Sequence, residues 1–177
     1  MSNLRWVIGA SLLALALGFG LYGLYASYSQ AEWNDEVALF VADPAYTEEC
    51  GDCHLAYPPG LLPAQSWQAM MQGLDDHFGD NAELDADTAA HIHDYLQGAA
   101  LAPGAPGMMR KMLRNLPATA PIRITELPYF ISAHRPIAGF AEQQEMSLGN
   151  CEGCHVDALS GRFREPLSEE EILLDQN

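Results

Sequence analysis

Two copies of one short motif, Cys-x-x-Cys-His, constrain this chain more than any other feature. The copies read Cys50-Gly51-Asp52-Cys53-His54 and Cys151-Glu152-Gly153-Cys154-His155, and they use every cysteine in the 177 residues. This spacing is the attachment motif of covalent haem. Two thiols three positions apart reach two vinyl groups on one porphyrin edge, and the histidine that follows binds the iron. The sequence therefore predicts two covalently bound haem c groups, with His54 and His155 as one axial ligand of each iron.

Two other uses of paired cysteines explain the motifs less well. A single zinc ion bound by Cys50, Cys53, Cys151 and Cys154 would leave the histidine after each pair without a role. A redox dithiol needs no histidine there and normally belongs to an α/β fold, of which the sequence gives no sign.

Four further histidines compete for the second axial position on each iron. His77 follows an expected helix beside Leu74 and Phe78, and His134 follows the aromatic pair Tyr129-Phe130. We expect His77 and His134 to be the distal ligands, one for each haem. His91 and His93 are two apart on a helix and point in different directions, so they are expected at the surface. The methionines at helical spacing are expected to pack rather than to bind iron; they are Met70, Met71, Met108, Met109 and Met112.

The rest of the sequence predicts a mainly α fold of short helices and loops wrapped around the two haems. Helices are expected over residues 35–41, from a cap at Ser66 to about residue 78, over residues 108–116, and from Thr125. Another helix is expected after Leu84-Asp85-Ala86-Asp87, with Ile92, Tyr95, Leu96 and Ala99 on one face. The prolines of residues 57–63 predict an extended segment. We expect the haems to complete a thin core, with six side chains packed around them, and the chain without haem to be largely unfolded. Those side chains are Trp67, Phe78, Tyr95, Leu96, Tyr129 and Phe130.

The N-terminus predicts a membrane-spanning helix. Residues 6–25 carry no charge, and twenty residues of helix span about 30 Å, the thickness of a bilayer's hydrocarbon core. Ser29-Gln30-Ala31 also resembles a signal-peptidase site, so a cleaved signal peptide is the alternative. Because Arg5 precedes the apolar stretch, the remainder is expected outside the cytoplasm, on the periplasmic side of the bacterial inner membrane or soluble in the periplasm after cleavage.

The net charge of −16 excludes nucleic acid as a natural partner. Residues 31–109 hold fourteen carboxylates and no lysine or arginine, so this half is expected to attract a positively charged partner. The expected organisation is an anchor or signal peptide over residues 1–30, a first haem lobe over 31–100 and a second over 101–177. The two lobes together form one dihaem domain.

The chain resembles the small bacterial dihaem cytochromes c that pair with a periplasmic oxygen-binding haem protein and a membrane cytochrome b. Besides the two haem motifs, the resemblance rests on Tyr57-Pro58-Pro59-Gly60-Leu61-Leu62-Pro63, Ser66-Trp67, His77-Phe78-Gly79-Asp80-Asn81-Ala82 and Arg123-Ile124-Thr125. It implies an electron carrier with two bis-histidine haems, and hence the pairs His54/His77 and His155/His134. The order along the chain suggests this pairing, and a crossed arrangement stays open.

The expected function is non-enzymatic electron transfer from a membrane cytochrome b, or another membrane redox complex, to an exported haem protein or other acceptor. A dihaem peroxidase, or another enzyme with one open distal site, is the alternative. A third hypothesis is a subunit that relays electrons inside a larger membrane complex. No catalytic residue is expected for the carrier, because its six-coordinate irons exchange electrons without binding a substrate.

Overall fold

The computed structural model describes residues 2–37, 43–104, 107–163, 167–168, 170 and 172. These residues divide into two compact units, Met1–Asn34 and Asp35–Asn177. Within the described ranges the secondary structure is helical, and the only strand-like pairings are two isolated bridges. The mainly α fold expected from the sequence is therefore correct.

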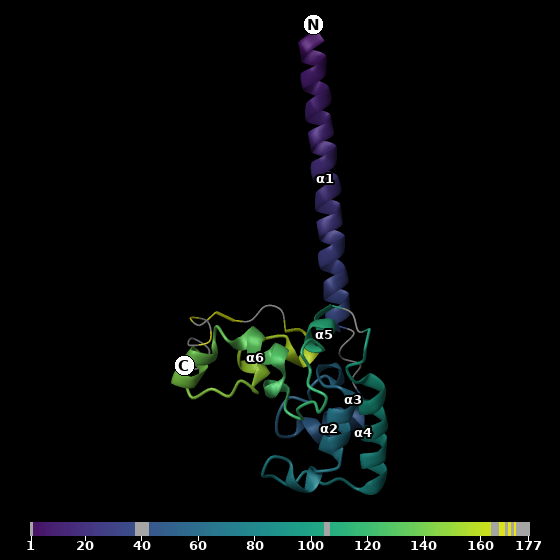
Figure 1. Ribbon diagram of the computed structural model, residues 1–177, viewed down its shortest axis with the longest axis vertical. Coiled ribbons are helices and arrows are strands. Elements are labelled where there is room, and N and C mark those ends of the chain that lie inside the picture. Colours follow the sequence, from purple (N-terminus) through teal and green to yellow (C-terminus); the bar gives the residue numbers. More distant parts are fainter. Residues whose placement is uncertain are drawn as a thin grey trace. The chain divides into compact units, whose positions relative to one another are not determined.

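Helix α1 (Ser2–Val37) forms one continuous helix (Figure 1). Its window Ser11–Tyr28 is long and apolar enough to cross a membrane, although a signal sequence meets the same criteria. Large apolar side chains are exposed all along this window, for example Leu13, Phe19 and Leu24. Residues 35–37 of the helix expected over 35–41 belong to α1, and its remainder lies outside the described residues.

Helix α2 (Pro44–Gly51) carries the first haem motif at its C-terminal end. Pro44 occupies its first turn, and the side chain of Asp43 accepts a hydrogen bond from the Tyr46 amide at 3.0 Å. This N-cap fixes where the helix begins and therefore where Cys50 lies.

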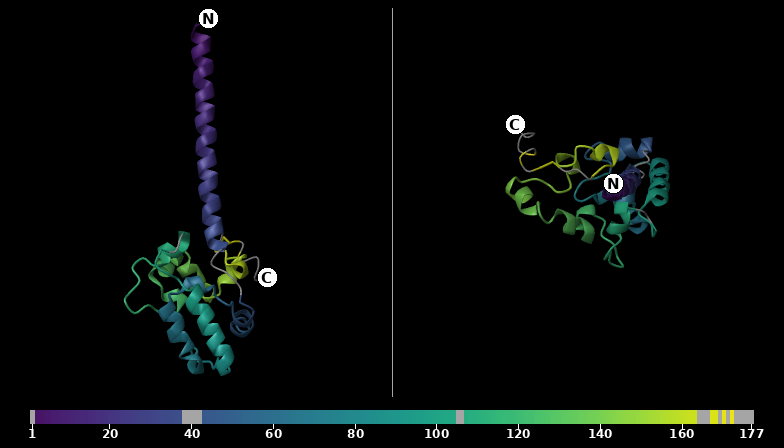
Figure 2. Two further views of the ribbon diagram at one scale, coloured as in Figure 1. Left: turned by 90° about the vertical axis from the view of Figure 1, so that its right-hand side faces the viewer. Right: turned by 90° about the horizontal axis from the view of Figure 1, so that it is seen from above.

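Helices α3 (Ala64–Met71) and α4 (Ala86–Ala99) pack side by side (Figures 1 and 2). The helix expected after Leu84-Asp85 is α4, and the Asp85 carboxylate caps it by accepting the amides of Asp87 and Thr88. Ile92 and Leu96, four residues apart, are buried in the core.

The expected cap at Ser66 is wrong. Helix α3 already begins at Ala64, directly after Pro63, and Ser66 lies inside the helix. Ser66 is 1% exposed, and its hydroxyl donates to the Pro121 carbonyl at 2.8 Å. A buried hydroxyl needs a partner, so this serine joins two distant segments instead of starting the helix.

The proline-rich segment after the first motif, residues 57–63, is largely buried. It contains a 3-10 turn, η1 (Pro59–Leu61), and the Trp67 indole donates to the Pro59 carbonyl at 2.7 Å. The core cluster joins this segment to α2, α3 and α4 through Tyr46, Leu62, Trp67, Ile92 and Leu96. Trp67 and Leu96, expected beside the haems, belong to this protein core.

The second half of the chain contains shorter elements. They are α5 (Gly107–Met112), η3 (Ile124–Glu126), α6 (Pro128–His134), α7 (Ala138–Gln143), η4 (Cys151–Gly153) and η5 (Ala158–Ser160). Helix α5 ends four residues earlier than expected, and Asn115 beyond it has a left-handed φ of 58°. The helix expected from Thr125 begins at Pro128 instead, because proline suits the first helical turn.

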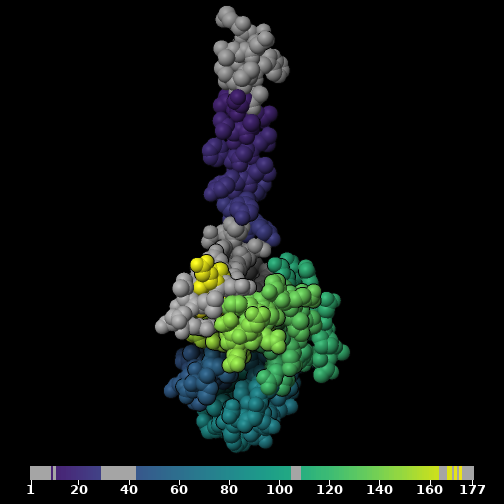
Figure 3. Space-filling model, turned by 90° about the vertical axis from the view of Figure 1, so that its left-hand side faces the viewer, coloured from purple at the N-terminus to yellow at the C-terminus, as the bar shows by residue number. Residues whose placement is uncertain are grey.

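On the face shown in Figure 3, the blue and teal residues of the first half adjoin the green residues of the second.

The buried face of α4 predicts a measurable stability difference. Ile92 is fully buried, so Ile92→Ala should lower the free energy of unfolding of the haem-loaded protein by about 2–5 kcal/mol. Ile131→Ala is the matched control, because 54% of Ile131 is exposed and its loss should change stability by about 0.5 kcal/mol at most. Urea titration measures both values, and equal losses would contradict this core.

Candidate functional site

The first haem motif faces a histidine from a distant loop. Cys50 ends its helix half-buried, whereas Cys53 and His54 follow in an exposed bend. The rings of His54 and His77 have their centres 6.1 Å apart, and their planes differ by only 25°. Two imidazoles thus lie nearly parallel with a gap between them.

A tight turn holds His77 in this position. Its amide donates to the Asp80 carbonyl at 2.7 Å, and the Asp76 carboxylate accepts the Gly79 amide at 3.0 Å. Phe78 and Gly79 inside the turn have φ values of 61° and 110°. A left-handed φ is costly for phenylalanine, and such strain is concentrated at functional sites. His77 therefore lies on a strained turn after η2 (Leu74–Asp76), and not at the end of the long helix that the sequence predicted.

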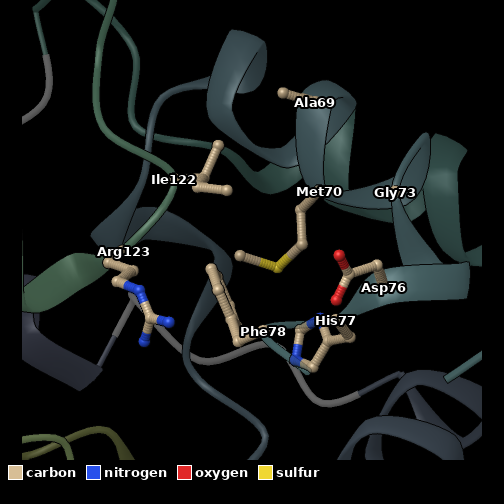
Figure 4. A pocket seen from close by; sticks show the side chains of 8 residues that line it. All are labelled: Ala69, Met70, Gly73, Asp76, His77, Phe78, Ile122 and Arg123. Carbon is tan, nitrogen blue, oxygen red and sulfur yellow. The ribbon is translucent and has the colours of Figure 1, made fainter. Parts of the chain in front are cut away.

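A cavity of about 370 Å³ opens beside His77 (Figure 4). Met70, Phe78 and Ile122 supply apolar walls. The Arg123 guanidinium lies 3.7 Å from the centre of the Phe78 ring, a cation–π contact that supports the strained residue. Sequence reasoning assigned Arg123 no role at this site, because nothing local links it to a phenylalanine 45 positions earlier.

The second motif faces a histidine at the end of α6. Cys151 lies in η4, Cys154 and His155 follow it, and all three side chains are half-buried. The rings of His134 and His155 have their centres 6.2 Å apart, and their planes are nearly perpendicular at 83°. The Phe130 ring stacks on His134 at 3.8 Å, one helical turn before it.

The second pair lines a larger and mostly apolar cavity of about 430 Å³. Both cysteines and both histidines of this half reach it. Its walls come from α5, α6, α7 and the segments around the motif, and include Met112, Tyr129, Phe130, Ile137, Phe140, Met146, Leu148 and Phe163. Phe78, Tyr129 and Phe130, which were expected beside the haems, line the two cavities, whereas Tyr95 packs on Tyr46 in the core.

The side chains of His54 and His134 each leave the Nε2 atom free to bind a metal. Nδ1 of His54 lies 2.8 Å from the Leu55 carbonyl, and Nδ1 of His134 lies 2.9 Å from the Phe130 carbonyl. A carbonyl only accepts, so each Nδ1 carries the proton and leaves the Nε2 lone pair free. Burial, and then the neighbouring His54, lower the pKa of His77; burial, and then His134, lower the pKa of His155. Both therefore stay neutral at pH 7, as metal ligands must.

In each histidine pair, the space between the two rings fits an iron ion. An imidazole nitrogen lies about 2 Å from a bound transition metal and its ring centre about 1 Å further, so opposed ligands have centres about 6 Å apart. The observed 6.1 and 6.2 Å match this spacing. Among the residues that the structure describes, Nδ1 of His155 is also buried without a hydrogen-bond partner, as at a site that takes up a further group.

The cysteine thiols fit covalent attachment to haem better than they fit a redox dithiol or a single zinc site. Burial, and then Glu49, raise the pKa of Cys50 to about 11, and burial raises that of Cys151 to about 11. Reactive dithiols need the opposite shift. Among the described residues no three metal-ligating side chains gather, so the four cysteines do not form one zinc site.

The remaining histidines lie elsewhere. Nε2 of His91 is 2.9 Å from the Asp43 carboxylate that caps α2, and Nδ1 of His93 is 3.4 Å from the Asp94 carboxylate. Neither histidine lines either cavity.

Comparison with known proteins gives the chain its family. The family model for dihaem cytochrome c matches residues 46–163. Among solved structures, the diheme cytochrome c from Rhodobacter sphaeroides is 38% identical, with 70% of this chain and 98% of that chain covered and a TM-score of 0.60. The diheme cytochrome c from Shewanella baltica OS155 is 36% identical over 68% of this chain and 86% of that one, with a TM-score of 0.54. No curated protein matches significantly. The chain belongs to the dihaem cytochrome c family and carries two covalently bound haem c groups.

Proposed function

We propose that this protein carries electrons through two bis-histidine haems, with His54 and His77 on one iron and His155 and His134 on the other. The observation that carries the proposal is the two pairs of facing imidazoles, with centres 6.1 and 6.2 Å apart. Bound haem supplies one-electron exchange between ferric and ferrous iron. Two fixed imidazoles keep each iron six-coordinate in both states, so little rearrangement accompanies the exchange.

Thioether bonds from Cys50 and Cys53, and from Cys151 and Cys154, attach the two haems in this proposal. The hydrogen bonds from Nδ1 of His54 and of His134 to backbone carbonyls orient these imidazoles and increase their basicity toward the metal. The apolar walls of the second cavity exclude water from its iron. These residues hold the iron ligands in place and limit the contact of the second iron with solvent.

A peroxidase or small-ligand enzyme receives less support. Such an enzyme needs one iron with an open side and a general acid or base beside it. Here each motif histidine faces a second histidine, and the remaining pair, His91 and His93, contacts Asp43 and Asp94 instead. Electron transfer therefore accounts for the arrangement more simply.

We further propose that α1 anchors the protein on the periplasmic side of the bacterial inner membrane. The uncharged stretch of residues 6–25 is longer than the roughly 7–15 apolar residues of a signal peptide, which supports an uncleaved anchor. Electrons then enter from a membrane cytochrome b or another membrane redox complex and leave to an exported haem protein or other acceptor. The exposed carboxylates of Glu48, Glu49 and Asp52 beside the first motif favour a basic partner surface there.

Removing either distal histidine should open one iron. His77→Ala or His134→Ala should bind carbon monoxide at half of the reduced haem and keep both covalent attachments, because the cysteines are untouched. Absorption spectra with and without carbon monoxide measure this. His91→Ala and His93→Ala are the matched controls; if either of them binds carbon monoxide instead, the ligand assignment is wrong.

The ring planes predict two different low-spin iron signals. Nearly parallel imidazoles separate the energies of two iron d orbitals, whereas perpendicular imidazoles leave them almost equal. With plane angles of 25° and 83°, we expect an ordinary rhombic signal from the first haem and a strongly anisotropic one from the second. Low-temperature electron paramagnetic resonance of the oxidised protein measures both. His134→Ala should remove only the anisotropic signal, and two identical signals in the unmodified protein would contradict the pairing geometry.

A further inference from the structure

One side chain, Tyr57, connects the two haem motifs. Its ring lies 5.0 Å from the His54 ring, with a plane angle of 34°. Its hydroxyl donates to the Gly149 carbonyl at 2.7 Å, across 92 positions of sequence. The Cys151 amide donates to the same carbonyl at 3.1 Å. A continuous series of contacts therefore runs from His54 of the first motif to Cys151 of the second.

The surrounding residues fix Tyr57 in this place. The buried Tyr46 hydroxyl donates to the Tyr57 carbonyl at 2.6 Å, and two buried prolines follow Tyr57 in the chain. Proline restricts its own φ and the conformation of the residue before it.

We propose that Tyr57 is the bridge for electron transfer between the two haems. With both haems bound, an electron would move between the iron held by His54 and the haem attached at Cys151 through the contact with the phenol ring and the hydrogen bond to Gly149. One iron would go from ferrous to ferric as the other goes from ferric to ferrous. Tyr57 keeps its proton and all its electrons, because it only couples the two centres. This inference rests on the proposed roles of His54 and Cys151.

The physical reason is electronic coupling. Bonded atoms and short hydrogen bonds couple two redox centres better than an empty gap of the same length. A hydrogen bond of 2.7 Å in a half-buried setting is such a link. The same bond also joins two distant segments, so the test must separate coupling from mere structural support.

Two substitutions of Tyr57 separate electronic coupling from structural support. Tyr57→Phe keeps the ring against His54 and removes only the hydrogen bond to Gly149, whereas Tyr57→Leu removes both. Tyr95→Phe is the matched control, because Tyr95 is also a half-buried tyrosine of the core, and its ring packs on Tyr46 away from the second motif. All three are studied as haem-loaded full-length protein.

The measurement is the rate at which an electron equilibrates between the haems after rapid photoreduction. Midpoint potentials and urea unfolding are measured alongside. We expect Tyr57→Phe to slow equilibration several-fold with both potentials unchanged, Tyr57→Leu to slow it further, and Tyr95→Phe to leave it unchanged. If Tyr57→Leu does not load both haems, Tyr57→Phe decides the question alone.

Two results would overturn the proposal. An unchanged rate in Tyr57→Phe would show that electrons cross directly between the haem edges, even if stability falls. An equal loss of rate in Tyr95→Phe would show a general effect on the fold. These results differ from a failure of the proposed function. If the bis-histidine ligation were wrong, carbon monoxide would bind the unmodified protein.

Discussion

Two pairs of histidines face one another across about 6 Å, the spacing that two axial imidazoles on one iron require, and the chain is organised around both pairs. In each pair, one histidine follows directly after the cysteines that attach the haem. The other comes from a separate segment that must be held rigidly. The strained turn around His77, and the short helix α6 with Phe130 stacked on His134, provide that rigidity in two different ways.

The two sites differ in ways that suit an electron relay. Cys53 and His54 are exposed and lie among carboxylates, whereas the second pair lines an apolar cavity. The first site is thus open to a charged partner, and the second is the better shielded from water. The plane angles differ as well, so irons held between these two pairs would differ in electronic state although their ligands are chemically the same. Tyr57 contacts His54 of the first motif and the carbonyl of Gly149, two residues before the second motif.

The sequence predicted those features that depend on residues close together in the chain. They are the haem motifs, the helix after Asp85 and the buried Ile92/Leu96 face of that helix. The Ser66 cap failed because the hydroxyl of Ser66 bonds to Pro121, a partner 55 positions away. The cation–π contact of Arg123 and the Tyr57 hydrogen bond to Gly149 also depend on tertiary packing, which no local pattern encodes.

Carbon monoxide binding to the unmodified protein, in its haem-loaded and fully reduced form, tests the central claim most directly. If two histidines close each iron, the absorption spectrum should not change when carbon monoxide is added at neutral pH. A carbon monoxide complex on half of the haem would mean that one iron has an open side. That result would contradict the bis-histidine account and favour a small-ligand enzyme.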